Sequence, residues 1–230
     1  MGVLIAVDGV DASGKQTQTE LLKSHLERER AVRLVSFPAY ESRSSELVKM
    51  YLNGDFGKNP EDVNAYAASV FFAADRYATF KSDWGRDYAG GKIIIADRYV
   101  SSNMIHQAGK IDDPEGKEKF LEWLHDLEYN KLGLPKPDIT IFLDMPPEYG
   151  ARLMRGRANK ITGRDDRDIH ESNAGYLKRS YDNALFAAKN RGWHIIPCVK
   201  NGAVRSIEDI HGEIYKTVTD MPFFADKAGL

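Results

Sequence analysis

Short apolar runs rich in β-branched residues recur along the chain, and longer segments with helical spacing separate them. The runs cover residues 3–7, 32–37, 93–96, 139–143 and 194–198. Continuous apolar runs of this length are typical of strands buried on both faces of a parallel sheet. The pattern therefore predicts five parallel strands.

The segments between these runs carry apolar residues at three- and four-residue spacing with charged outer faces, which predicts helices. The predicted helices cover residues 16–30, 44–52, 60–88, 101–109, 115–131, 147–157, 170–191 and 206–218. Strands that alternate with helices indicate an α/β fold with a doubly wound, five-stranded parallel sheet surrounded by helices. No repeat or Pro/Ser-rich linker divides the chain, so we expect a single domain over residues 1–230.

Composition narrows the class of protein. The chain has 230 residues, 42% of them hydrophobic, and 32 basic against 34 acidic side chains, a net charge of −2. This apolar fraction excludes general disorder, and the near-neutral balance argues against broad binding to nucleic acid. Because Cys198 is the single cysteine, no intrachain disulfide can form. We expect Cys198, at the end of a predicted strand, to be a small buried side chain and not a nucleophile.

The first apolar run is short and soon meets Asp8, so it does not fit a signal peptide, and no run approaches the roughly 20 residues that span a bilayer. We expect a soluble, cytoplasmic protein with neither a membrane nor a nucleic acid as partner.

A glycine-rich loop follows the first predicted strand and precedes the first predicted helix. Residues 9–16 read GVDASGKQ, which fits G-x-x-x-x-G-K-[ST] except at the last position. Backbone N–H groups of such a loop surround phosphates, and Lys15 supplies a charge for the β and γ oxygens. The alternative is an ordinary glycine-rich turn. The predicted ATP-binding residues are Gly9, Asp11, Ala12, Ser13, Gly14, Lys15, Gln16 and Thr17.

Gln16 stands where the motif has a Ser or Thr whose hydroxyl ligates Mg²⁺. Either the amide oxygen of Gln16 ligates the metal, or Thr17 or water takes that place. Asp97, at the end of the strand 93–96, would help to hold the ion, although a capping or ion-pairing role is the alternative. The predicted metal ligands are Asp97 and Gln16.

A regulatory GTPase would carry an N-K-x-D element after a later strand. Residues 130–133 read NKLG and lack the aspartate, so a GTP switch does not fit this chain.

Five features of the chain together resemble thymidylate kinase, of the nucleoside-monophosphate kinase family of P-loop proteins. They are the loop 9–18, the turn FPAY at 37–40, the segment FFAADR at 71–76, the element Asp97-Arg98-Tyr99 and the arginine-rich stretch after Asp144. The resemblance implies a five-stranded parallel sheet with a mobile lid. It also implies in-line transfer of the γ-phosphoryl group of ATP to dTMP, giving dTDP for dTTP synthesis. A monophosphate acceptor is already anionic, so such a site needs cations and alignment more than a general base.

Residue by residue, the resemblance predicts an acceptor site. Phe72 and Arg76 are four apart on a helical pattern and so share a face, where Phe72 would stack on the base and Arg76 contact it or the phosphate. A purely core role is the alternative for the aromatic residues, and a generic turn is the alternative for residues 37–40. The predicted acceptor residues are Asp11, Phe37, Tyr40, Phe72, Arg76, Arg98, Asn103, His106, Gln107, Asp168 and Glu171.

Several of these residues have a more specific expected role. Asp11 would approach the 3′-hydroxyl and phosphate, unless it only stabilises its turn. Arg98 would bridge the donor and acceptor phosphates. His106 stands at a place that tyrosine often holds in the family. With Ser102, Asn103 and Gln107 it would read the pyrimidine and screen the sugar. Asp168 and Glu171 would close over the acceptor, or else cap the helix that follows.

The segment at about 150–170 is the predicted lid. Between residues 150 and 168 it holds six basic and three acidic side chains, with Gly156 and Gly163 as flexible points. A solvated charged face is the alternative. Because Ala12 leaves the loop without an arginine, the chain resembles the lid-arginine group of the family. The predicted catalytic residues are Lys15, Arg98, Arg157, Arg164 and Arg167.

Two rival functions remain at this point. A nucleoside kinase, acting on thymidine for example, would need a carboxylate base beside the 5′-oxygen, and Gln16 leaves open a catalytically weak nucleotide-binding module. Residues 201–204 are a candidate adenine-contacting loop. The family commonly dimerises through helices beside the acceptor site, so we also expect a homodimer.

Overall fold

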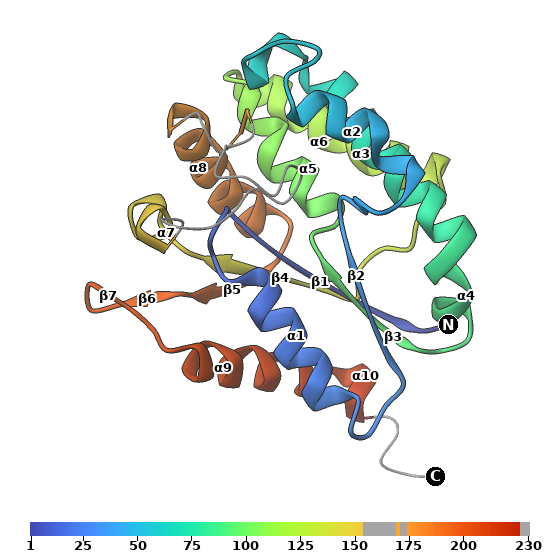
Figure 1. Cartoon of the computed structure of the whole chain (residues 1–230). Coiled ribbons are helices and arrows are strands. Elements are labelled where there is room, and N and C mark those ends of the chain that lie inside the picture. The colour runs from blue at the N-terminus through green and yellow to red at the C-terminus, as the bar shows by residue number, and fades with distance from the viewer. Residues whose placement is uncertain (154–168, 171–173, 226–230) are drawn as a thin grey trace.

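The computed structural model describes residues 1–153, 169–170 and 174–225. Its central sheet has five strands, all parallel, in the order β2-β3-β1-β4-β5 (Figure 1). Each strand begins at the residue predicted from the sequence, and the five-stranded parallel sheet is confirmed. The strands are β1 (Val3–Gly9), β2 (Val32–Ser36), β3 (Ile93–Asp97), β4 (Ile139–Asp144) and β5 (His194–Pro197).

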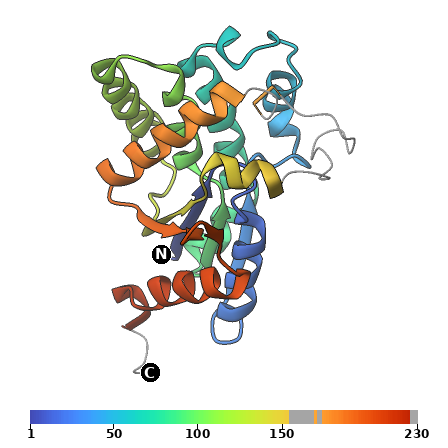
Figure 2. The ribbon, with the colours of Figure 1, turned by 90° about the vertical axis from the view of Figure 1, so that its left-hand side faces the viewer.

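Helices cover both faces of the sheet, as Figures 1 and 2 show. Alternate residues of β1 divide between the two layers: Ile5 and Val7 pack with one set of helices, and Leu4 and Ala6 pack with the other. The first layer is α1 (Lys15–Leu26) and α9 (Ile207–Thr219). The second layer includes α5 (Val100–His106), α6 (Pro114–His125) and α8 (Ala174–Asn190). The three central strands, β1, β3 and β4, are almost entirely buried, which explains their uninterrupted apolar runs.

The segment 60–88, predicted as one helix, is several. It comprises a 3₁₀ turn (Pro60–Asp62), α3 (Ala65–Thr79), a π-helical segment (Phe80–Trp84) and α4 (Gly85–Ala89). The break before α3 has a local cause, because the Asn64 side chain accepts a hydrogen bond from Ala67 N and caps the new helix. Similarly, α6 passes into a π-helical segment, Asp126–Lys131. Upstream of α3, a 3₁₀ turn (Arg43–Ser45) leads into α2 (Glu46–Leu52).

Other differences from the predicted elements lie after β4. The helix predicted over 147–157 is α7 (Pro147–Leu153) as far as the structure describes it. The predicted helix 170–191 corresponds to α8. Residues 201–204, predicted as a loop, belong to an antiparallel hairpin of β6 (Val199–Lys200) and β7 (Ala203–Val204). Asn201 and Gly202 both have positive φ at its turn, the pattern that Asn-Gly favours in two-residue hairpin loops.

A short helix after α9, α10 (Pro222–Ala225), was not predicted. Within the described ranges, no helix is long and apolar enough to cross a lipid bilayer. The expectation of a single domain over the whole chain stays a prediction.

The strand register brings the informative sequence positions together. Val7 pairs with Asp97, and Gly9 pairs with Leu143, so the carboxyl ends of β1, β3 and β4 meet at one edge of the sheet. Ligands of open α/β sheets bind outside this edge.

Candidate active site

The glycine-rich loop connects β1 to α1. Ala12 (φ 60°) and Gly14 (φ 86°) have left-handed backbone conformations that fold the loop back over the strand end. Lys15 begins α1, and its ammonium group donates to the carbonyl oxygens of Gly9 and Val10, both at 2.8 Å. The loop therefore holds its one lysine over the phosphate-binding arch predicted from the sequence.

Gly9 is required by its surroundings. A Cβ atom at this position would lie 2.6 Å from Ser13 Oγ and 2.9 Å from the carbonyl oxygen of Leu143, closer than real Cβ contacts come. The Leu143 carbonyl belongs to β4 and cannot move aside without disturbing the sheet. Any side chain here would distort the loop.

Lys15 is buried among charges of both signs. Burial lowers the pKa of Lys15 to about 8, and the positive charge of Arg98 acts in the same direction. The carboxylates of Asp11, Asp97 and Asp8 oppose the shift. An incoming polyphosphate would add negative charge and restore the protonated form.

Arg98 lies between the loop and a neighbouring pocket. It follows β3 with φ 69°, a conformation that is uncommon outside glycine, and its guanidinium forms an ion pair with Asp11. Nη1 lies 3.4 Å from Ser102 Oγ and 3.2 Å from His106 Nε2. Burial opposes the charge, but Asp11, Asp8 and Asp97 raise the pKa of Arg98 above its ordinary value, so it stays positive.

Asp8 is a site residue to which the sequence analysis assigned no role. It is fully buried at the end of β1 and accepts hydrogen bonds from Gly9 N (2.9 Å), Ser101 Oγ (2.8 Å) and Ser102 Oγ (2.9 Å). Its carboxylate also lies 4.0 Å from Arg98 Nη1. The position of Asp8 in the sequence could have indicated this role, because it is an acidic residue at the end of a buried strand.

The pocket beside Arg98 gathers most of the predicted acceptor site. Nine of the eleven predicted residues line it. They come from separate parts of the chain, namely the loop, the 37–40 turn, α3, the end of β3, α5 and the position just after α5. The nine are Asp11, Phe37, Tyr40, Phe72, Arg76, Arg98, Asn103, His106 and Gln107. Four more residues complete the lining, namely Pro38, Leu52, Ser102 and His170. Pro38 belongs to the predicted turn and Ser102 was predicted beside Asn103, whereas Leu52 and His170 were not predicted.

The 37–40 turn is held by a buried carboxylate. Asp75 on α3 accepts from Ala39 N at 2.8 Å and from Ser44 Oγ at 2.5 Å. It therefore fixes the wall of the pocket that carries Phe37 and Tyr40.

Arg76 is buried at the base of the pocket and forms a two-point ion pair with Glu128, with Nε at 2.7 Å and Nη2 at 2.5 Å from the carboxylate oxygens. Burial would lower the pKa of Arg76, but Glu128 raises it. The sequence did not indicate that Glu128 is buried, because nothing local distinguishes one acidic residue from the others in a charged amphipathic helix.

His106 faces Arg98 as a neutral ring. Arginine can only donate, so His106 Nε2 is the acceptor and the ring proton sits on Nδ1. Burial, reinforced by Arg98, lowers the pKa of His106 to about 3. Within the described part of the chain, the buried atoms His106 Nδ1 and Gln107 Oε1 have no hydrogen-bond partner, so the pocket wall presents one donor and one acceptor.

The two predicted metal ligands differ in their surroundings. Asp97 is buried at the end of β3, and its Oδ1 has no hydrogen-bond partner among the described residues. Gln16 is exposed, and its amide donates to Glu20 at 3.1 Å along α1. An unpartnered buried carboxylate oxygen beside Lys15 is the kind of ligand that Mg²⁺ accepts. Asp97 therefore fits such an ion, and Gln16 would have to leave Glu20 to join it.

Five predicted residues lie outside the described ranges, namely Arg157, Arg164, Arg167, Asp168 and Glu171. They stay predictions from the sequence. The candidate adenine loop at 201–204 comprises the exposed turn of the β6–β7 hairpin and the strand β7, and its contact with a base is likewise untested.

Comparisons with known proteins agree on one family. The pattern of the family described as thymidylate kinase matches residues 7–214. A thymidylate kinase of Mycobacterium tuberculosis is 33% identical over 194 residues, covering 83% of this chain and 87% of the relative. A putative thymidylate kinase of Aeropyrum pernix is 27% identical over 227 residues, covering 94% and 95% of the two chains.

Solved structures share the fold. The thymidylate kinase of Candida albicans superposes with a TM-score of 0.68 at 23% identity, covering 94% of this chain and 91% of that one. The thymidylate kinase of Ehrlichia chaffeensis superposes with a TM-score of 0.65 at 22% identity, covering 94% and 98%. These likenesses confirm the predicted P-loop kinase architecture.

The environment of Lys15 predicts a pH dependence of ATP binding. Because the pKa of Lys15 is about 8 in the free protein and phosphates favour its protonated form, affinity should fall as pH rises above 8. We expect the dissociation constant of ATP to rise roughly twentyfold between pH 7.5 and 9.5, with one proton taken up on binding at the higher pH. Calorimetric titration in two buffers of different ionisation enthalpy measures both quantities. The variant Lys15→Met should show no such proton uptake, and unchanged affinity across this range in the wild type would contradict the assignment.

Proposed function

The chain belongs to the thymidylate kinase family, and we propose that the loop around Lys15 and the pocket beside Arg98 are the donor and acceptor sites of one phosphoryl transfer. The enzyme phosphorylates dTMP to dTDP with ATP as the donor. The observation that carries the assignment of the two sites is Arg98, whose guanidinium contacts Asp11 of the loop and His106 of the pocket.

On the donor side, we assign the β and γ phosphates to the loop amides of residues 9–17 and to Lys15. The left-handed conformations of Ala12 and Gly14 shape the arch, and the Lys15 ammonium group already lies over it. Phosphoryl transfer depends on alignment and positive charge more than on covalent chemistry. The terminal phosphate of ATP would then face Arg98 and the acceptor in line.

On the acceptor side, the pocket offers an aromatic surface at Phe72, cationic donors at Arg76 and Arg98, and polar atoms at His106 and Gln107. Phe72 packs edge-on against Tyr51, with ring centroids 6.2 Å apart, so its face is held in a fixed direction. We propose that Phe72 stacks on thymine, while Tyr40 and Arg98 hold the phosphate and Asp11, His106 and Gln107 surround the deoxyribose.

The remaining catalytic charge is proposed to come from the lid segment. Lys15 is the only basic side chain among residues 9–16, because position 12 is an alanine and not the arginine that the resemblance implies for some members of the family. Arg98 supplies one further cation, and Arg157, Arg164 and Arg167 are the sequence's candidates for the rest. The chain would then be of the lid-arginine type.

A thymidine-type nucleoside kinase is not favoured, because such an enzyme needs a carboxylate free to take a proton. Asp97 has an unpartnered oxygen, but we assign this residue to the metal. Burial alone would raise the pKa of Asp11, but Arg98 and Lys15 hold it well below its usual range, which makes this carboxylate a poor base. Asp8 is occupied by two serine hydroxyls and a backbone amide. The alternative of a nucleotide-binding module with weak catalysis has no support from the comparisons, which all lead to kinases.

The substrate assignment is tested by steady-state ADP release with Mg²⁺ and ATP against dTMP, dUMP, UMP, CMP, AMP, GMP and thymidine. We expect dTMP to be the preferred acceptor by at least tenfold in kcat/KM over every ribonucleotide. Turnover of thymidine but not of dTMP would overturn the acceptor site while leaving the ATP loop intact.

We propose Mg²⁺ as the metal, held by Asp97 directly or through water, with Gln16 as a second candidate ligand. When bound, the ion would neutralise charge on the β and γ phosphates. This chain contributes a buried carboxylate oxygen with no described partner, which is the observation that supports the site.

Substitutions distinguish the two candidate ligands. Asp97→Asn should raise the Mg²⁺ concentration for half-maximal activity at least tenfold, because a neutral amide replaces the anionic ligand. Gln16→Ser should leave this concentration unchanged or lower it, since a hydroxyl is the ligand that the motif usually has. Initial rates over a Mg²⁺ series at saturating ATP and dTMP provide the measurement. A large loss in Gln16→Ser with no change in Asp97→Asn would reverse the assignment.

A homodimer is supported by apolar side chains on the outer faces of α2 and α3. Tyr66, Val70 and Tyr77 are 42%, 46% and 38% exposed at helical spacing on α3, and Leu47 and Met50 on α2 are 45% and 39% exposed. A second copy of this chain is the occupant that we propose for this face. Cytoplasmic location and the absence of a nucleic-acid partner stay predictions from charge and cysteine content.

The dimer predicts a sedimentation-equilibrium mass near twice 25.9 kDa at micromolar concentration. Val70→Lys should shift the mass toward one chain, because it places a charge in the apolar face. A matched substitution at an exposed apolar site on another surface, Val204→Lys, should leave the mass unchanged. A monomeric wild type would remove the proposal.

A further inference from the structure

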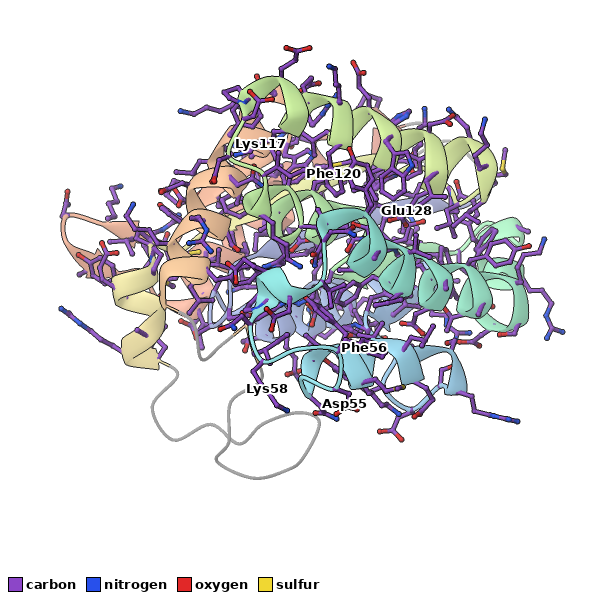
Figure 3. The ribbon with its side chains drawn as sticks, turned by 90° about the horizontal axis from the view of Figure 1, so that it is seen from above. Asp55, Phe56, Lys58, Lys117, Phe120 and Glu128 are labelled. Carbon is purple, nitrogen blue, oxygen red and sulfur yellow. The ribbon has the colours of Figure 1, made fainter. Side chains whose placement is uncertain are left out.

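Glu128 is a buried acidic residue outside the pocket lining, yet it contacts two residues that line the pocket. Its side chain has no exposed surface and lies in the π-helical segment that follows α6. In Figure 3 it lies between the ribbons of α6 and α3. It receives hydrogen bonds from Arg76 on α3 and from Asn103 on α5.

The contacts to Asn103 determine which way its amide points. Asn103 Nδ2 lies 3.2 Å from the carbonyl oxygen of Ser69 and 3.2 Å from Glu128 Oε1. Both neighbours can only accept, so the end of the amide that faces them must be the NH₂ group. The carbonyl oxygen, Oδ1, is then the end of the amide left for a ligand in the pocket that Asn103 lines.

The contacts to Arg76 fix its guanidinium in the same way. Of its five N–H groups, two bond Glu128 and a third approaches the carbonyl oxygen of Tyr99 at 3.4 Å. The two that remain have no partner among the described residues, and Arg76 lines the same pocket as Asn103. The pocket thus presents an acceptor from Asn103 beside donors from Arg76.

This order of donor and acceptor matches one class of pyrimidine. Thymine and uracil carry a donor at N3–H next to an acceptor at O4, whereas cytosine carries an acceptor at N3 next to a donor amino group. A cytosine in the same place would set N3 against Asn103 Oδ1 and its amino group against the guanidinium. Unpaired buried polar groups of this kind are costly.

We propose that Glu128 is a positioning residue that sets the pocket's preference for 4-oxo over 4-amino pyrimidines by fixing Arg76 and the amide of Asn103. A carboxylate has no N–H group, so it accepts from both partners at once and holds both in one orientation. The inference rests on the proposed acceptor site and deepens it, since Glu128 itself does not touch the substrate.

Glu128→Gln tests the proposal with little change in volume. One amide NH₂ replaces an acceptor oxygen, so Arg76 loses a hydrogen-bond partner. The guanidinium of Arg76 and the amide of Asn103 are then no longer held in one orientation. We expect the ratio of kcat/KM for dTMP to that for dCMP to fall at least tenfold. The change should lie mainly in KM for the pyrimidine nucleotide, while KM for ATP stays within about twofold. A merely structural role would lower the rates with both acceptors and leave the ratio unchanged, and that result would overturn the proposal.

Glu118→Gln is a matched control. It removes the acid of another Glu–Arg ion pair, Glu118 with Arg191 at 2.5 Å, from α6 and away from the acceptor pocket. The ratio of kcat/KM for dTMP to that for dCMP should not change in this variant. A fall comparable to that of Glu128→Gln would contradict the role proposed for Glu128.

The wild-type enzyme offers a second test should Glu128→Gln not fold. Calorimetric binding should place dUMP within about tenfold of dTMP and dCMP at least a hundredfold weaker. Equal binding of dCMP and dUMP would show that the donor and acceptor order is wrong. Wild-type turnover of dTMP remains a separate readout, so failure of this inference is distinguishable from failure of the proposed function.

Discussion

The ion pair between Arg98 and Asp11 ties the end of β3 to the loop at 9–16, and the proposed donor and acceptor sites both depend on it. The neighbouring backbone fixes its geometry, because Arg98 N donates to Val7 O at 3.0 Å and Val7 pairs with Asp97 across the sheet. The loop begins two residues after Val7. A cation at this point is therefore held by the sheet itself, without a flexible connection.

Three buried carboxylates hold residues around the pocket beside Arg98. Asp8 holds serine hydroxyls on α5, Asp75 holds the 37–40 turn, and Glu128 holds Arg76 and Asn103. Each accepts at least two hydrogen bonds, which offsets the cost of removing a charge from water. The side chains proposed to contact substrate are thus oriented by residues that do not touch it, as preorganised sites require.

The sequence predicted which candidate residues lie together where those residues directly follow a strand. The loop at 9–16 and the Asp97-Arg98 element stand at strand ends, and a parallel sheet brings such ends together whatever the helices do. Glu128 could not be found this way, because its partner Arg76 lies 52 residues away and nothing local marks its burial. The division of the segment 60–88 was missed although Asn64 is a capping residue, since the apolar spacing continues on both sides of the break.

The most direct test of this account is the turnover number of Arg98→Lys with ATP, Mg²⁺ and dTMP all saturating. Lysine keeps the charge but cannot contact Asp11 and the transferred phosphate through a fork of N–H groups. The account predicts that kcat falls by about 10² to 10³, the scale for loss of one preorganised electrostatic contact, with the unfolding transition little changed. A kcat within threefold of the wild type would contradict the claim that Arg98 joins the two sites.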